Sequence, residues 1–217
     1  MKRLISLAFP ILALLCSCED AADSYRYPSV LTDYACLLTD ATGQPEQFCL
    51  DNGNAYPIAF TDEYREAYDK LPTYKADTPY RVISMYELGA DSAAHIYSMA
   101  QTISMVPTPL REGETLYQDP VYLQSIWLSG GYMNIVIELK ALDGRHSIGF
   151  VDTTSEGMQG KEITFYHNAY NDIESYRQKL YASIPLIPLR EDLQQGDTLR
   201  FVINLYDEGI TQWEFVM

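Results

Sequence analysis

The stretch that decides the fold spans residues 125–151 and reads SIWLSGGYMNIVIELKALDGRHSIGFV. Two β-rich runs lie inside it, Tyr132–Leu139 and His146–Val151. Between them, the segment Leu142–Arg145 contains an Asp-Gly dipeptide, which is typical of the tight turn that joins two antiparallel strands. We therefore predict a hairpin with its turn at residues 142–145, to which the other strands are added.

The composition indicates a globular and strongly acidic chain. Hydrophobic residues make up 47% of the 217 positions, so a core can form over most of the length. Acidic residues outnumber basic ones by 30 to 15, and two of the basic residues, Lys2 and Arg3, lie in the leader described next. A surface this negative repels phosphate groups, so we expect no nucleic acid as a partner. At about 100 to 200 residues per domain, the length fits two small β domains.

The N-terminus has the features of a bacterial lipoprotein signal peptide. Met1–Arg3 is basic, and the apolar run Leu4–Leu15 is shorter than the roughly 20 residues that span a bilayer. The segment Leu15-Cys16-Ser17-Cys18 resembles a lipobox, in which only Cys18 follows a small residue. We expect residues 1–17 to be removed and a lipid on Cys18 to attach the protein to a membrane. An ordinary secretory signal with incidental cysteines is the alternative.

Acidic residues directly after the lipidated cysteine indicate the outer membrane. Glu19, Asp20 and Asp23 resemble the export signal that sends lipoproteins of the phylum Bacteroidota to the outer face of that membrane. We expect a lipid-anchored protein at the cell surface, with the periplasmic face left open because the acidic cluster is interrupted. Residues 18–29 are expected to form an acylated tether between the lipid and the fold.

Residues 30–116 are predicted to form a small β-barrel. A short helix is expected over Thr61–Leu71, which has apolar residues at helical spacing and stops before Pro72. Turn signals such as Asp51-Asn52-Gly53-Asn54 separate the strand-like runs. Four or five strands and one helix in this length are the size of a small barrel. The expected strands are Val30–Asp40, Gln47–Ile58, Tyr80–Leu88 and Ala94–Val106.

Two cysteines in the predicted barrel form a candidate disulfide. If Thr42-Gly43 is a two-residue turn, Cys36 lies directly opposite Cys49 in a pair without backbone hydrogen bonds. Such a pair brings the Cα atoms to about 4.5 Å, within the range of a disulfide. An exported protein also meets oxidising surroundings. Two small buried hydrophobic residues with free thiols are the alternative.

Residues 117–217 are predicted to form an antiparallel β-sandwich. The boundary is placed between the proline-rich and charged segment 107–114 and Asp119-Pro120. Short strands and turns then alternate at the regular spacing of a sandwich. Besides the central hairpin, the expected strands are Ile163–His167, Leu180–Leu189, Thr198–Tyr206 and Thr211–Val216.

Several short motifs together resemble the NigD-like family of lipoproteins. In the second half they are Trp127–Asn134, His146, and Tyr166-His167-Asn168 with Asp172; in the first half they are the lipobox and Asp51-Asn52-Gly53. The resemblance covers nearly the whole mature chain. It implies an all-β protein, with a small OB-like barrel at residues 30–116 followed by a β-sandwich at residues 117–217. The family takes its name from a bacteriocin gene cluster and has no established activity, so the resemblance predicts the fold and not the function.

The candidates for ligand binding gather around these motifs. His146, His167 and Asp172 have side chains that suit zinc or iron, but their spacing matches no metal-binding motif, and we expect no metal and no cofactor. Trp127, Tyr132 and Tyr166 could form a face on which a sugar stacks, with packing in the core as the commoner role of such residues. The binding candidates are therefore Trp127, Tyr132, His167, Asn168 and Asp172, with turn formation as the alternative role of the last two.

The sequence contains none of three common catalytic or phosphate-binding motifs. It has no Gly-Lys-Ser/Thr phosphate loop, no Gly-x-Ser-x-Gly nucleophile turn and no Cys-x-x-Cys pair. We predict a non-enzymatic lipoprotein of the cell envelope that acts as a binding or accessory module, with a glycan, a peptide or another envelope protein as its partner. The first alternative is immunity-type protection, in which the acidic surface binds a basic toxin or bacteriocin peptide. The second is a hydrolase with a carboxylate pair or a metal site.

Overall fold

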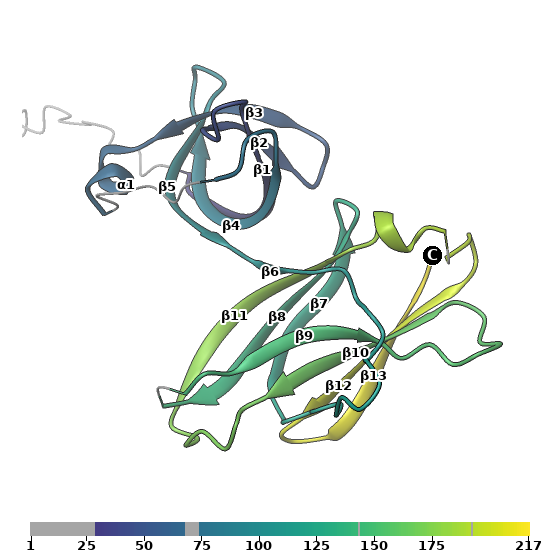
Figure 1. The fold of residues 1–217 in the computed structure, drawn as a ribbon. Coiled ribbons are helices and arrows are strands. Elements are labelled where there is room, and N and C mark those ends of the chain that lie inside the picture. Colours follow the sequence, from purple (N-terminus) through teal and green to yellow (C-terminus); the bar gives the residue numbers. More distant parts are fainter. Residues whose placement is uncertain (1–28, 68–73, 143, 192) are drawn as a thin grey trace, which may run out of the picture.

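Two β modules make up the part of the chain that the structure describes (Figure 1). The structure is a computed structural model, and it describes residues 29–67, 74–142, 144–191 and 193–217. The predicted signal peptide, Cys18 and all of the predicted tether except Ser29 lie outside these ranges. Within them, no helix has the length and hydropathy needed to span a bilayer.

The first module is the expected OB-like barrel. Its five strands close in the order β1-β2-β3-β5-β4, with β1 pairing back onto β4. The helix α1 (Asp62–Ala67) follows β3 and is the described part of the predicted helix, since residues 68–73 lie outside the description. The strands are β1 (Leu31–Thr39), β2 (Pro45–Leu50), β3 (Ala55–Phe60), β4 (Pro79–Leu88) and β5 (Ala94–Gln101).

Alternating side chains fill the barrel interior. Leu37, Phe48, Val82 and Tyr86 point inward and are almost completely buried, and the rings of Phe48 and Tyr86 meet edge to face at 4.9 Å between centroids. The residues between them point outward. Three residues of that outward row, Tyr34, Cys36 and Arg81, contact the second module.

The two cysteines are neighbours, as predicted, but they are not bridged. Cys36 and Cys49 are direct partners in the β1–β2 pairing, and both are free thiols. The Cys36 sulfur lies 3.4 Å from the hydroxyl of Tyr132 in the second module. Where a disulfide was predicted, Cys36 therefore makes a contact with the second module instead.

The turn between β1 and β2 differs from the predicted two-residue turn. The backbone N–H of Asp40 donates to the carbonyl of Gln44 at 2.9 Å, which leaves three residues in the loop. The third, Gly43, has a φ of +82°, a conformation that glycine adopts without strain. A bulge between Leu38 and Thr39 then restores the register that the shorter turn would have given.

The second module is a sandwich of two four-stranded sheets, with the orders β13-β12-β10-β9 and β6-β11-β8-β7. Most pairs are antiparallel, but β10 pairs β12 and β11 pairs β6 in parallel. A short 3₁₀ helix, Ile187–Leu189, follows β11. The strands are β6 (Ile103–Ser104), β7 (Tyr122–Ser129), β8 (Tyr132–Ala141), β9 (Ser147–Asp152), β10 (Lys161–Asn168), β11 (Tyr176–Pro185), β12 (Thr198–Leu205) and β13 (Gly209–Val216).

The predicted central hairpin is wrong, because β8 and β9 belong to different sheets. β8 pairs with β7 through the turn Gly130-Gly131 on one side and with β11 on the other, so both of its edges are taken. Its residues 133–137 are all buried, as expected of a central strand. The chain therefore crosses between the sheets after β8, and β9 pairs with β10 instead.

The connection between the modules is part of the sandwich. β6 pairs with Ala182 and Ser183 of β11, so the second module takes in residues that precede the predicted boundary at 117. The following segment makes single parallel bridges to three strands of the opposite sheet, at Thr108, Gln118 and Val121. The sandwich core lies between the two sheets and includes Ile135, Phe165 and Phe201.

Candidate functional site

The two modules meet at an ion pair on the outer surface of the barrel. Arg81 lies beside Cys36 in the barrel register and points away from the interior. Its guanidinium donates to both carboxylate oxygens of Asp51, from Nη1 to Oδ1 at 2.5 Å and from Nη2 to Oδ2 at 2.7 Å. The Arg81 side chain is 1% exposed and that of Asp51 is 18% exposed. Burial opposes the charge of Arg81, but the hydrogen bonds and the charge of Asp51 outweigh it and raise the pKa of Arg81.

Hydrogen bonds extend this ion pair into the sandwich and back. Arg81 Nη2 donates to Asn134 Oδ1 at 2.9 Å, Asn134 Nδ2 donates to Ser129 Oγ at 3.1 Å, and the Ser129 hydroxyl donates to Asp51. Asn134 is fully buried, and its Oδ1 accepts a second hydrogen bond from Ser183 at 2.8 Å. We call Asp51, Arg81, Ser129 and Asn134 the joint ring, because two residues of each module close one circuit.

Aromatic side chains cover the joint ring. The Tyr132 ring lies 4.2 Å from the Arg81 guanidinium carbon and the Tyr34 ring lies 5.3 Å from it, which are cation–π distances. The Tyr34 hydroxyl donates to the Ile135 carbonyl at 2.9 Å, another contact between the modules. Trp127 meets Tyr34 edge to face and donates from its indole nitrogen to Ser129 Oγ at 3.2 Å. Trp127 and Tyr132 therefore pack around the joint ring.

The turn Gly130-Gly131 allows this close approach. Gly130 has a φ of +59° and Gly131 a φ of +80°, as the two central residues of a tight hairpin turn require. A Cβ atom on Gly130 would lie 2.2 Å from Asp51 Oδ1, whereas one on Gly131 would meet nothing within 4 Å. Gly130 is therefore needed for its missing side chain as well as for its backbone conformation.

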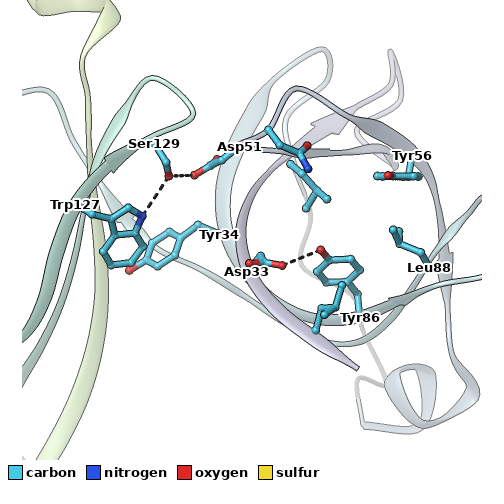
Figure 2. Close-up of a pocket in the computed structure, with 11 residues that line it drawn as sticks. Asp33, Tyr34, Asp51, Tyr56, Tyr86, Leu88, Trp127 and Ser129 are labelled. Atoms are coloured by element: carbon cyan, nitrogen blue, oxygen red, sulfur yellow. Dashed lines mark hydrogen bonds between the residues drawn. The ribbon is translucent and has the colours of Figure 1, made fainter. Parts of the chain in front are cut away.

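A cleft of about 400 Å³ opens at the mouth of the barrel beside the joint ring (Figure 2). Asp33, Tyr56, Tyr86 and Leu88 stand in the barrel opening in Figure 2, and Trp127 stands outside it on the sandwich. We call this hollow the mouth cleft. Its lining consists of Leu31, Asp33, Tyr34, Leu50, Asp51, Asn52, Tyr56, Tyr86, Leu88, Trp127 and Ser129.

A hydrogen bond fixes the polar group inside the mouth. The Tyr86 hydroxyl donates to Asp33 Oδ2 at 2.8 Å. Burial, and then the hydrogen bond and charge of Asp33, raise the pKa of Tyr86 above its usual range. Tyr86 therefore remains a donor, and Asp33 is held in the opening as an acceptor.

The face of an OB-like barrel that binds oligonucleotides or oligosaccharides includes strands 2 and 3. Here Phe48 and Tyr56 of β2 and β3 point inward. The residues that alternate with them, Gln47, Cys49, Ala55 and Pro57, offer neither an aromatic ring nor a positive charge. This face therefore lacks the stacking and basic groups of a nucleic-acid site.

The predicted histidine candidates lie in a separate cluster in the sandwich. His167 Nδ1 lies 2.9 Å from the Asp119 carbonyl, His146 Nδ1 lies 2.8 Å from His167 Nε2, and His146 Nε2 lies 3.2 Å from Asp172 Oδ2. All four ring nitrogens therefore lie within hydrogen-bond distance of a partner or of each other. Among the described residues, no group of three or more His, Cys, Asp or Glu side chains could hold a metal ion.

The number of protons on the two histidines decides how many of these contacts are hydrogen bonds. Both ends of the chain of contacts, the Asp119 carbonyl and the Asp172 carboxylate, are acceptors, and two neutral imidazoles supply only two N–H groups. All three contacts are hydrogen bonds at once only when the pair holds one additional proton. Burial, together with the charge of His146, lowers the pKa of His167, although the Asp119 carbonyl opposes this.

Asp172 and Asn168 hydrogen-bond the backbone of turns. Asp172 Oδ2 accepts from the backbone N–H groups of Leu142 at 2.9 Å and Gly144 at 3.0 Å, which ties together two loops of the sandwich. Asn168 Oδ1 accepts from the N–H of Tyr170 at 2.8 Å within its own turn. These are the contacts of side chains that organise turns.

The structure does not bring the predicted binding candidates into one site. Trp127 and Tyr132 lie at the joint ring, while His167, Asn168 and Asp172 lie in the histidine cluster or its turns. The predicted stacking face of Trp127, Tyr132 and Tyr166 is also not formed, because Tyr166 borders a different hollow, where it meets Tyr117 edge to face. Four further residues of the joint ring and the mouth cleft, Asp33, Tyr56, Tyr86 and Arg81, were not predicted from the sequence. No local motif marks them, because they become neighbours only when the barrel closes.

Known proteins resemble this chain in sequence and in fold. The family described as the NigD-like C-terminal β-sandwich domain matches residues 104–217. The chain is similar to the crystal structure of a NigD-like immunity protein from Bacteroides caccae, with 27% identity and a TM-score of 0.70, over 88% of this chain and 99% of that one. A search of curated proteins found no match.

Two more distant structures share the fold. One is a putative toxin-related protein from Parabacteroides distasonis, with 18% identity and a TM-score of 0.62, over 87% of this chain and 93% of that one. The other is a protein of unknown function from Bacteroides vulgatus, with 14% identity and a TM-score of 0.61, over 87% and 91%. The sandwich match covers more than half of the chain, and the neighbour from Bacteroides caccae has both modules in common with it. The chain belongs to the NigD-like family.

Proposed function

We propose that this protein is a non-enzymatic, lipid-anchored binding module of the cell envelope, whose binding surface is the mouth cleft. The lipobox at Cys18 supports the anchor, and the acidic residues after it support the outer membrane, at the cell surface. Binding rather than catalysis is supported by the similar structure from Bacteroides caccae, which is described as an immunity protein. The predicted partners are a glycan, a peptide or another envelope protein.

The observation that carries this proposal is that both modules build the mouth cleft. The barrel supplies Asp33, Tyr56 and Tyr86, and the sandwich supplies Trp127 and Ser129. Concave, largely apolar hollows with a few fixed polar groups are the usual form of a ligand site. The joint ring holds the sandwich residues at the rim of this hollow, which gives the link between the modules a role in binding.

The test is to obstruct the mouth cleft without touching the joint ring. Leu88→Arg places a long side chain in the opening, and Met85→Arg places the same side chain on the same strand but outside the cleft. Leu88 and Met85 are 42% and 44% exposed, so both variants are expected to fold. On glycan and peptide arrays, we expect Leu88→Arg to lose the ligands that the wild type and Met85→Arg retain. Equal binding by all three proteins, or binding by none, would refute the mouth cleft as the binding surface.

The anchor has its own test. Mass spectrometry of the exported protein should find an acylated Cys18 as the first residue. Cys18→Ala should be processed differently and should not partition with membranes. A free thiol on Cys18 in the exported chain would contradict the anchor.

A second candidate function is immunity against a toxin or bacteriocin. It is favoured by the neighbour from Bacteroides caccae, which is described as an immunity protein and resembles this chain over both modules. The test compares bacterial cells with and without the gene, exposed to cationic bacteriocins. Immunity predicts survival only with the gene and loss of survival with Leu88→Arg. Equal survival of both strains would exclude this role for the bacteriocins used.

A further inference from the structure

We propose that the mouth cleft is a recess for the cationic side chain of a lysine or arginine in a peptide, with Asp33 as the charge that receives it. This inference rests on the proposed function, because it names the ligand class of the same cleft. Among the described residues, the lining includes two carboxylates, Asp33 and Asp51, and no lysine, arginine or histidine.

The two carboxylates are not equivalent. Asp51 is held by both terminal nitrogens of Arg81, so its charge is balanced inside the protein. Asp33 accepts its hydrogen bond from the neutral hydroxyl of Tyr86, which positions the carboxylate but does not neutralise it. The net charge of the opening is therefore the single negative charge of Asp33.

The walls of the mouth fit the stem of such a side chain. Tyr56 and Tyr86 offer aromatic surfaces, and Leu31, Leu50 and Leu88 offer aliphatic ones. Lysine and arginine bury their methylene groups along apolar surface and keep the charged head at a polar one. A cation near a tyrosine ring also gains cation–π attraction. The recess therefore combines apolar walls with a fixed anionic acceptor, as a long basic side chain requires.

The rest of the protein favours the same ligand charge. The chain has a formal net charge of −15, so its field attracts cationic peptides and repels anionic ones, most strongly at low salt. A neutral glycan gains nothing from this field. Carboxylates and aromatic rings can also bind sugars, and a neutral oligosaccharide probe distinguishes sugar binding from peptide binding.

The experiment measures binding to the purified full-length protein by isothermal titration calorimetry. The probes are a short lysine-rich peptide, the same peptide with acetylated lysines, its glutamate counterpart and a neutral oligosaccharide. The variant is Asp33→Asn, whose amide oxygen can still accept the Tyr86 hydroxyl. The control is Glu46→Gln, which removes the same charge from an exposed position on β2 outside the cleft.

We expect the lysine peptide to bind the wild type and Glu46→Gln alike, and Asp33→Asn to weaken its binding about tenfold or more, since hydrogen bonds to charged groups are the strong ones. Acetylated and glutamate peptides should bind at least about tenfold more weakly than the lysine peptide. Acetylation tests the proposal even if Asp33→Asn fails to fold. Equal affinity of the acetylated peptide, or of Asp33→Asn, overturns the cationic recess. If the oligosaccharide binds and Leu88→Arg abolishes that binding, the cleft function stands and only the ligand class is wrong. If no probe binds, the inference fails, and the array experiment above decides the cleft function separately.

Discussion

The joint ring and the histidine cluster are both polar networks that close on an aspartate, but their charges have different chemistry. At the joint ring, the charged partner of Asp51 is an arginine, which stays protonated at every physiological pH. In the histidine cluster, the partner of Asp172 is the imidazole of His146, which contacts His167, and burial lowers the pKa of His167. The first network holds two modules together, and the second ties loops within one module. The comparison indicates that the link between the modules is independent of pH while the loops at the cluster respond to it.

The largest loss of stability is expected when the joint ring is broken. Asp51→Ala leaves the guanidinium of Arg81 buried without its counter-charge, and breaking a buried pair in this way costs about 3 to 5 kcal/mol. Chemical denaturation of the variant and the wild type measures this loss in the free energy of unfolding. The control is Glu174→Ala, which breaks the exposed ion pair with Lys140 near the histidine cluster and should leave the midpoint unchanged. Equal effects of the two variants would mean that the joint ring does not stabilise the protein.

The second-largest loss of stability is expected at the turn Gly130-Gly131, where two variants separate the contact with Asp51 from backbone strain. Gly131→Ala places an alanine at a φ of +80° in open space and should cost about 1 to 2 kcal/mol. Gly130→Ala has the same backbone problem and also forces its Cβ against Asp51, so it should cost about 1 to 3 kcal/mol more. Denaturation of both variants gives the difference. If Gly130→Ala is no worse than Gly131→Ala, Asp51 does not lie against the turn.

A smaller effect should distinguish the histidine cluster by pH. Because the pKa of His167 is lowered in the fold, the unfolded chain binds this proton more tightly. The contribution of His167 to stability is therefore complete above about pH 6.5 and is lost as the pH falls below that value, at up to about 1.4 kcal/mol per pH unit. His167→Asn should remove this dependence, whereas joint variants should retain it. A His167 pKa at or above about 6.5 by NMR titration would contradict the account.

The smallest effect is expected at the cysteines. Cys49→Ser changes a free, half-buried thiol, so the unfolding midpoint should hardly move and should be the same with and without reductant. A disulfide closing a loop of this length would add about 3 kcal/mol, which the variant or the reductant would remove. A large reductant-dependent loss would show that the bridge forms in solution.

The sequence predicted some strands closely, but it merged β2 and β3 into the single run Gln47–Ile58. The expected strands Val30–Asp40 and Tyr80–Leu88 agree with β1 and β4 to within one residue at each end, because their apolar pattern and bounding turns are local signals. The predicted pairing of Cys36 with Cys49 is also observed, although it was derived from a turn of the wrong length. A bulge compensated for the error, and a bulge leaves no clear pattern in a single sequence.

The hairpin prediction failed for a physical reason. Asp143-Gly144 has the sequence of a hairpin turn, but Gly130-Gly131 competes for the same strand, and β8 has only two edges. The continuous apolar run Ile135–Ile137 is buried throughout, as is typical of a strand that is covered on both faces. Which neighbours fill its two edges depends on β11, which lies far along the chain, and no local turn signal contains that information.

The site was only partly predictable. Trp127, Asn134 and Asp51 stood out in the sequence because they belong to motifs of the family, yet their motifs give no sign that they share one network. Ser129 and Asp51 are 78 residues apart in sequence, and their contact exists only because the hairpin of one module reaches the turn of the other. The motifs that suggested ligand binding are thus largely the residues that hold the two modules together.

The most direct test of this claim is a double-mutant cycle between the modules. Arg81→Met and Asn134→Ala each remove one partner of the 2.9 Å hydrogen bond that crosses the joint. Chemical denaturation of the wild type, both single variants and the double variant gives the coupling energy. The account predicts a coupling of about 1 kcal/mol or more. Additive effects, within about 0.5 kcal/mol, would mean that the two modules are not joined through these residues.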